Sequence, residues 1–198
     1  ASAEACLKAR GSPGFLGTRI EFVPAADVVT MDDKPQQAVK KKNSSMRVAC
    51  NLVEEGRASA VVSVANSGAM VATSSFVFGR LKGVARPAIG TILPSYAPVG
   101  TAPSTSTRFG RTLLVDAGAN NLCEPLHLAQ FGVMGSVYLE HAFGMTRPTV
   151  AVLSNGEEEH KGTPLAREAL ALLKRTDVNV VGFCEGRDLT ACVVHVVV

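Results

Sequence analysis

The sequence lacks the patterns that mark disulfide-rich, zinc-binding and membrane-spanning proteins. Its five cysteines include no C-x-x-C pair and lie far apart, at Cys6, Cys50, Cys123, Cys184 and Cys192. Isolated thiols are typical of reduced cysteines in a cytosolic protein, and they argue against a disulfide framework or a zinc knuckle. No apolar run is long enough to span a bilayer. We therefore expect a cytoplasmic protein whose cysteines belong to its core.

The motifs of nucleotide, metal and nucleophile sites are also missing. The sequence contains neither G-x-x-x-x-G-K-[ST] nor G-x-G-x-x-G, so no nucleotide site is indicated. It has no H-E-x-x-H or D-x-D-x-D frame, and neither Ser67 nor Ser136 lies in a G-x-S-x-G elbow. We expect no metal, no cofactor and a chemistry that depends on positioning and charge.

The net charge of the chain is small. The 198 residues carry a formal net charge of +3, which is too small to argue for a nucleic-acid partner. Hydrophobic residues make up 46% of the chain and charged residues 19%, as in globular proteins. The chain is long enough for one substantial core or for a domain and a half.

What the sequence does contain is a strand, a polar turn and a helix, repeated several times. Val-rich runs predict buried strands near Ala60 to Val64, in TLLV, in TVAVL, in VNVVGFC and in VVHVVV. Helices are predicted from Ser45, from about Ala69, from Pro125 and from Thr163-Pro164. This alternation is typical of an α/β fold with a largely parallel sheet.

Polar turns follow four of these predicted strands. They are Asn66-Ser67-Gly68, Asp116 to Asn120, Asn155 to Lys161, and Glu185 to Asp188. Ligands of such sheets bind beyond the carboxyl ends of the strands. We therefore predict an anion site in a crevice lined by these turns.

The stretch SNGEEEHKGTPLAREALALLK, from Ser154 to Lys174, is open to several interpretations. Adjacent residues such as Glu157, Glu158, Glu159 and His160 rarely direct their side chains to one metal ion, whereas acidic residues before a helix suit its dipole. Lys161 differs, because a cation at that place is locally unfavourable and suggests an anionic ligand. Lys42 beside Ser44 and Ser45 could bind a phosphate in the same way, or form an ordinary serine cap with solvated lysines.

Several long motifs together resemble one protein family. They are DKPQQAVKKKNSSM, VSVANSGAM, GRLKGVARPAIGTILP, LLVDAGAN, HLAQFGVMGSVY, RPTVAVLSNGEEEHKG and CEGRDL. In order and spacing they are similar to the PlsX-type fatty acid/phospholipid synthesis proteins, the acyl-acyl-carrier-protein:phosphate acyltransferases. The resemblance runs from about Glu21 to Val198.

The resemblance implies a fold, a reaction and partners. The fold would be a three-layer α/β/α arrangement of the isocitrate/isopropylmalate dehydrogenase-like kind, in a homodimer. The reaction would transfer a fatty acyl group from acyl carrier protein to inorganic phosphate, in the cytoplasm and with peripheral contact to the membrane. The alternatives are a short-chain, CoA-dependent phosphate acyltransferase and a diverged, inactive scaffold that binds acyl carrier protein.

The resemblance also implies site residues, position by position. Lys161 matches the family's lysine before a glycine and is the predicted catalytic residue. The predicted substrate- and phosphate-binding residues are Lys42, Ser44, Ser45, Asn66, Ser67, Gly68, Asp116, Asn120, Glu185 and Asp188. Gly118 and Arg187 complete two of the matching turns.

Four positions depart from the family pattern. The family usually has Lys at His160, Asp at Leu122, Glu at Leu126 and Asp at His195. Glycine-rich turns expected before and after the matching region are absent from this chain. We therefore expect a poorly defined segment over residues 1–20 and an acyltransferase-like domain over 21–198, truncated at both ends, with a flexible excursion over 95–110.

Overall fold

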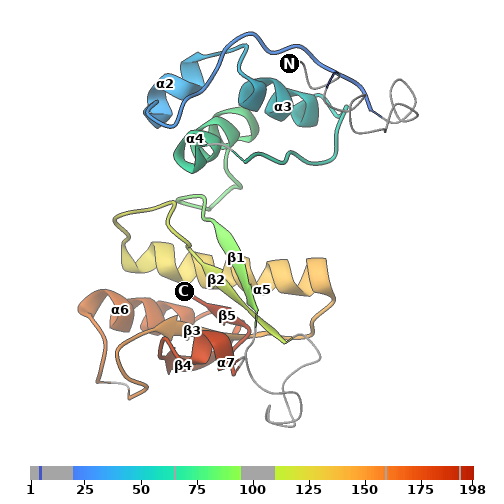
Figure 1. Cartoon of the computed structure of the whole chain (residues 1–198). Helices are drawn as coiled ribbons and strands as arrows, with labels where there is room; N and C mark the ends of the chain where they lie inside the picture. Colours follow the sequence, from blue (N-terminus) through green and yellow to red (C-terminus); the bar gives the residue numbers. More distant parts are fainter. Residues whose placement is uncertain (1–4, 6–19, 65, 95–109, 159, 192) are drawn as a thin grey trace. The chain divides into compact units, whose positions relative to one another are not determined.

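The structure, a computed structural model, describes residues 5, 20–64, 66–94, 110–158, 160–191 and 193–198. It divides into two compact units, residues 1–79 and residues 80–198, each of which is described by itself (Figure 1). The excursion predicted over residues 95–110 and the segment predicted over residues 1–20 fall almost wholly outside the described residues. The single domain over 21–198 stays a prediction.

The described part of the first unit is helical. Its helices are α2 (Pro35–Lys40), α3 (Ser45–Glu54) and α4 (Ser67–Phe78). Helices α2 and α3 both pack against α4, around a small core of Ala38, Met46 and Ala69. The predicted helix start at Ser45 is confirmed, since the Ser44 hydroxyl accepts a hydrogen bond from the Arg47 amide at 3.3 Å.

The strand predicted near Ala60 to Val64 is wrong. These residues form no strand, and the side chains of Val62 and Val64 are 91% and 103% exposed. A β-branched run becomes a strand only where a neighbouring strand accepts its backbone hydrogen bonds and covers its side chains. No such neighbour lies beside this segment in the described part of the chain.

The second unit is built on a five-stranded mixed sheet. Its strands are β1 (Gly90–Pro94), β2 (Arg111–Val115), β3 (Thr149–Leu153), β4 (Asn179–Cys184) and β5 (Val196–Val197). Their order across the sheet is β1-β2-β5-β3-β4. Only β1 is antiparallel to its neighbour, so the predicted α/β fold with a largely parallel sheet is confirmed. The last strand of the chain thus lies between β2 and β3, with both of its valines fully buried.

Two long helices cover one face of this sheet. They are α5 (Pro125–Phe143) and α6 (Pro164–Leu173), and both begin at the proline that the sequence predicts. Their core with the sheet includes Phe131, Leu173 and Val150. Helix α5 lies very close to the sheet at Gly135, where an added Cβ would stand 2.5 Å from a Val196 methyl carbon.

The opposite face of the sheet carries a smaller core. Ala151, Cys184 and Val197 form it, and Leu189 of the short helix α7 (Asp188–Ala191) packs against them. The expectation that cysteines belong to the core is confirmed for Cys50 and Cys184, which are buried and unpaired. Cys123 is partly buried, and the remaining two cysteines lie outside the described residues.

Candidate functional site

Three of the four predicted polar turns lie at one edge of the sheet. Strands β2, β5, β3 and β4 run parallel, so their carboxyl ends share an edge. The turns that follow β2, β3 and β4 are Asp116 to Asn120, Asn155 to Lys161, and Glu185 to Asp188. The fourth turn, at Asn66, belongs to the first unit and is described separately.

The Asp116 carboxylate organises the turn after β2. Its Oδ1 accepts hydrogen bonds from the amides of Ile89 at 2.8 Å and Ala119 at 3.1 Å. Its Oδ2 accepts from the Asn120 amide at 2.7 Å and from Asn120 Nδ2 at 3.0 Å. Asn120 Nδ2 also donates to the Pro87 carbonyl at 2.8 Å. The two side chains therefore join the segment before β1 to the segment after β2.

This geometry gives Asp116 and Asn120 a positioning role. Four donors already surround the carboxylate, and an anion beside it would meet a negative charge. Gly118 has a φ of 103°, a left-handed conformation that the tight turn requires and that glycine adopts without strain.

The turn after β3 leads directly into α6. Asn155 Oδ1 accepts a hydrogen bond from the Gly162 amide at 3.1 Å and closes the turn. Thr163 caps α6 through its hydroxyl, which accepts from the Ala166 amide at 3.1 Å. A hollow of about 350 Å³ lies between the end of β3 and the first turn of α6, and its lining is Leu153, Ser154, Asn155, Gly162, Thr163 and Ala166. The positive end of the α6 dipole adjoins this hollow.

Lys161 lies in this turn, immediately before the hollow's Gly162 and Thr163. Lys161 is exposed, and its Nζ has no hydrogen-bond or ion-pair partner within the described ranges. The stem of its side chain lies over Gly156, because an added Cβ there would stand 2.9 Å from Lys161 Cγ. Gly156 thus leaves room for the lysine stem, and the charge stays available for a ligand.

Arg187 links the turns after β3 and β4, which follow neighbouring strands. Its guanidinium forms ion pairs with Glu157 at 3.0 Å and Glu185 at 3.3 Å, and lies 4.0 Å from Asp188. Hydrogen bonding to Glu157 and the nearby carboxylates raise the pKa of Arg187. Asp188 also accepts the Glu185 amide at 2.7 Å through Oδ2. The predicted ligands Glu185 and Asp188 are therefore engaged in the turn itself.

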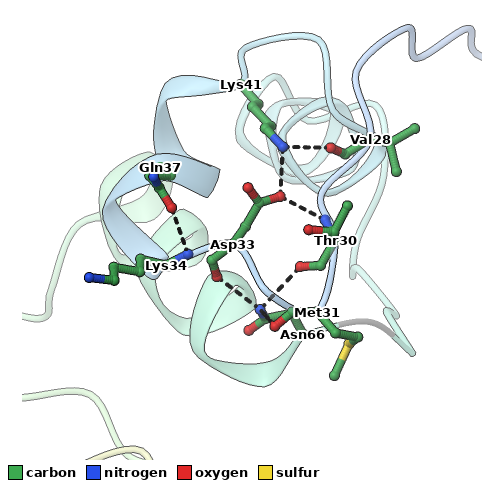
Figure 2. A network of polar contacts seen from close by, with 8 residues as sticks. All are labelled: Val28, Thr30, Met31, Asp33, Lys34, Gln37, Lys41 and Asn66. Carbon is green, nitrogen blue, oxygen red and sulfur yellow. Dashed lines mark hydrogen bonds and ion pairs between the residues drawn. The ribbon is translucent and has the colours of Figure 1, made fainter.

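In the first unit, Asn66 connects α4 to the loop before α2 (Figure 2). Its Oδ1 caps α4 by accepting from the Ala69 amide at 3.0 Å. Its Nδ2 donates to three carbonyl oxygens of the loop, those of Thr30, Met31 and Asp33, at 3.1–3.3 Å. Gly68 lets the start of α4 approach α2, since an added Cβ would stand 3.3 Å from Pro35 Cγ.

The predicted phosphate contact of Lys42 stays a prediction, while its neighbour Lys41 forms polar contacts within the first unit. The Lys41 Nζ donates to Asp33 Oδ2 at 2.6 Å and to the Val28 carbonyl at 2.8 Å (Figure 2). The hydrogen bond from Lys41 and that from the Thr30 amide lower the pKa of Asp33. Lys42 and Ser45 are exposed, whereas Ser44 is buried in its capping role.

The four departures from the family pattern fall in different places. Leu122 and Leu126 are 82% and 50% exposed, around the start of α5. His160 is exposed in the turn after β3. His195 precedes β5 and is buried, and its Nδ1 accepts a hydrogen bond from the Thr149 amide at 2.9 Å. His195 therefore lies at the amino edge of the sheet, opposite the polar turns.

Sequence reasoning missed two ion pairs that shape these regions, Lys41 with Asp33 and Arg187 with Glu157. The second could have been suspected, because both residues follow strands that the alternation makes neighbours. The first joins residues eight apart, on either side of α2, and has no sequence signal of its own. No group of three or more His, Cys, Asp or Glu side chains among the described residues could hold a metal ion.

Comparison with known proteins gives consistent results. A family profile described as fatty acid synthesis protein matches residues 4–198. A phosphate acyltransferase of Myxococcus xanthus (strain DK1622) is 50% identical over 175 residues, which are 88% of this chain and 47% of the relative. A phosphate acyltransferase of Syntrophotalea carbinolica (strain DSM 2380 / NBRC 103641 / GraBd1) is 49% identical over 183 residues, 92% of this chain and 49% of the relative. The chain spans about half the length of the curated relatives it matches.

Proposed function

Because this chain belongs to the fatty acid synthesis protein family, we propose that it is part of a phosphate acyltransferase of phospholipid synthesis. The enzyme would move a fatty acyl group from acyl carrier protein to inorganic phosphate and release acyl phosphate. The observation that carries the proposal is Lys161, an exposed cation with no partner among the described residues, beside the hollow at the start of α6.

This site suits phosphate as the nucleophile. The hollow beside the α6 amino end offers the positive end of a helix dipole, and Lys161 adds a full positive charge next to it. Glu157 does not cancel that charge, because it is paired with Arg187. A dianion would therefore be attracted locally to the hollow beside Lys161, rather than to the carboxylates of the neighbouring turns.

In the proposed step, a phosphate oxygen attacks the thioester carbonyl carbon. A C–O bond forms, the carbonyl oxygen gains negative charge, and the C–S bond then breaks to give acyl phosphate and the carrier thiolate, which takes up a proton from water. Lys161 would stabilise both the bound phosphate and the charge that develops on the carbonyl oxygen. No protein nucleophile is needed, which is consistent with the missing G-x-S-x-G elbow.

Finer features of the resemblance belong to the same proposal. They are an isocitrate/isopropylmalate dehydrogenase-like arrangement in three layers, a homodimer, and peripheral contact with the membrane. No helix within the described residues is both long enough and apolar enough to cross a membrane.

The test is an acyl-transfer assay on the native protein that contains this chain. Acyl phosphate formation would be compared for long-chain acyl-acyl carrier protein and for acetyl- and butyryl-CoA, each with phosphate. We expect turnover with the carrier-bound long chain only. Turnover with the short CoA thioesters alone would favour the CoA-dependent alternative, and carrier binding without any turnover would favour the inactive scaffold.

A further inference from the structure

The second unit has an apolar cavity of about 490 Å³ between the β1–β2 hairpin and α5, a size within the usual range of ligand pockets. Its lining residues are Ala88, Gly90, Ile92, Leu113, Val115, Met134, Gly135 and Tyr138. None of them is charged, and Tyr138 brings the only side-chain oxygen. Nothing in the phosphate chemistry at Lys161 uses this cavity.

Small residues make the cavity. Gly90 has no side chain to fill the space beside it. A Cβ added at Gly90 would have one neighbour within 4 Å, Leu113 Cδ1 at 3.3 Å. Ala88 provides a single methyl on the same side. The opposite wall is α5, which Gly135 brings close to the sheet. Tyr138 is 48% exposed, so the cavity reaches solvent beside its ring.

One end of the cavity adjoins the polar turn after β2. In the hairpin register, Gly90 lies opposite Val115, and Ile92 lies opposite Leu113. Val115 is followed directly by Asp116, and Ile89, between Ala88 and Gly90, donates its amide to Asp116 Oδ1 at 2.8 Å. The apolar wall therefore runs from the polar turn along the hairpin.

We propose that this cavity binds the hydrocarbon tail of the acyl substrate, with the tail's polar end toward the turns. The inference rests on the proposed function, because that function supplies a ligand with a polar head and a long saturated chain. Strands β2 and β3 are separated by β5 alone, so the Asp116 and Lys161 turns are roughly 10 Å apart across the sheet. A long acyl chain whose head lies near Lys161 can span this distance and enter the cavity with its distal carbons.

The experiment measures saturated fatty acids of increasing length as competitors of a fluorescent fatty acid bound to the 198-residue chain. The affinity is expected to rise about fourfold per methylene until the cavity is full, and to level off beyond that length. The chain length at which the affinity levels off is the limit that the variants should shift. Ala88→Leu fills the cavity and should move this limit to shorter acids. Met134→Ala enlarges the cavity and should move the limit to longer acids.

Ala171→Leu, on the exposed face of α6, is the matched control and should leave the limit unchanged. Opposite shifts in Ala88→Leu and Met134→Ala cannot come from misfolding, so together they would support the site. An identical limit in Ala88→Leu and Ala171→Leu would overturn it. A second result would also overturn the site: Ala88→Leu abolishes a dimer but leaves the chain-length limit of fatty-acid binding unchanged. The cavity would then be occupied by a second copy of the chain.

The acyl-transfer assay separates this inference from the proposed function. If the fatty-acid limit shifts as expected but no acyl phosphate forms, the cavity is supported and the proposed function fails. If acyl phosphate forms with the same chain-length profile in the native protein and in its Ala88→Leu variant, the function stands and the cavity assignment fails.

Discussion

The turns after β2 and after β3 lie at the same edge of the sheet, yet they use their polar groups in opposite ways. In the first, all four donors around the Asp116 carboxylate come from the protein itself. In the second, Lys161 is exposed and has no partner among the described residues. Both turns match the same family, but among the described residues only the turn after β3 has a charged side chain, that of Lys161, without a partner.

The difference separates residues that build a site from a residue that can act in it. A carboxylate satisfied by backbone amides contributes to folding, and removing it leaves those amides without an acceptor. An unpaired cation before a helix amino end is slightly unfavourable for folding and gains a favourable partner only when an anion binds. Substitutions at Asp116 and Lys161 should therefore affect different quantities.

The largest expected effect is that of Lys161→Ala on the rate. Losing a charged contact to phosphate and to the developing oxyanion should raise the barrier by about 2–4 kcal/mol, which lowers the rate roughly 30- to 1000-fold. The free energy of unfolding should change by less than about 0.5 kcal/mol, because the side chain removed is exposed and has no partner in the described ranges. Acyl phosphate formation and urea unfolding measure the two quantities.

Glu157→Ala and Glu158→Ala are the controls for Lys161→Ala. Both change a charge in the same turn, and each should alter stability by no more than a few tenths of a kcal/mol and the rate little. If all three variants have equally small effects on the rate, the turn is a solvated helix entrance and the assignment of Lys161 is wrong.

The second effect is that of Asp116→Ala on stability. It removes the acceptor of three backbone amides and of the Asn120 side chain, and should lower the free energy of unfolding by about 3 kcal/mol. Asp116→Asn keeps one acceptor oxygen and should lose less. Urea unfolding gives both values. An Asp116→Ala variant as stable as the native chain would show that water replaces the carboxylate without loss.

Asn66, in the first unit, is a second polar side chain whose hydrogen bonds within the protein should contribute to stability. Asn66→Ala removes the α4 cap and three hydrogen bonds to the loop before α2, at an expected loss of about 1–2 kcal/mol. Asn66→Ser can still cap the helix but cannot reach the three carbonyls, so it should lose about half as much. Amide exchange in α4 reports the opening of this unit. Equal exchange in both variants would mean that the hydrogen bonds to the loop alone matter, whereas native-like exchange in Asn66→Ser would mean that the cap alone matters.

Four of the five strands could be predicted from the sequence, because they are short runs of apolar residues, whereas β1, which contains no valine, was not predicted. The starts of α3, α5 and α6 could be predicted from Ser44, Pro125 and Thr163-Pro164, since capping is a local property. The segment from Ala60 to Val64 has the same composition as the real strands. It fails because strand formation depends on a partner, which a local pattern does not contain.

The candidate site was predictable in place but not in detail. Strand ends show where polar turns gather, which is how Asp116, Lys161 and Glu185 could be singled out. They do not show which side chains are already bonded within the turn. Lys41 is an example, because the sequence does not show that its Nζ is bonded to Asp33 and to the Val28 carbonyl.

The last prediction concerns His195, at the edge of the sheet opposite both turns. Its Nδ1 accepts the Thr149 amide at 2.9 Å, so the proton of the neutral ring is on Nε2, which is buried without a partner among the described residues. A second proton would have to lie on Nδ1, against that amide hydrogen. Burial also lowers the pKa of His195 below its ordinary value of 6.5.

The sign of the pH effect follows from this lowered pKa. Above pH 6.5 the imidazole is neutral in both the folded and the unfolded chain, so its titration does not affect stability. As the pH falls below that value, the unfolded chain takes up the proton first and the free energy of unfolding decreases. His195→Asn keeps an acceptor for Thr149 but cannot be protonated, so unfolding curves at pH 7.5 and at pH 5 should differ less for this variant than for the native chain. Equal differences in the two proteins would place the acid sensitivity elsewhere in the chain.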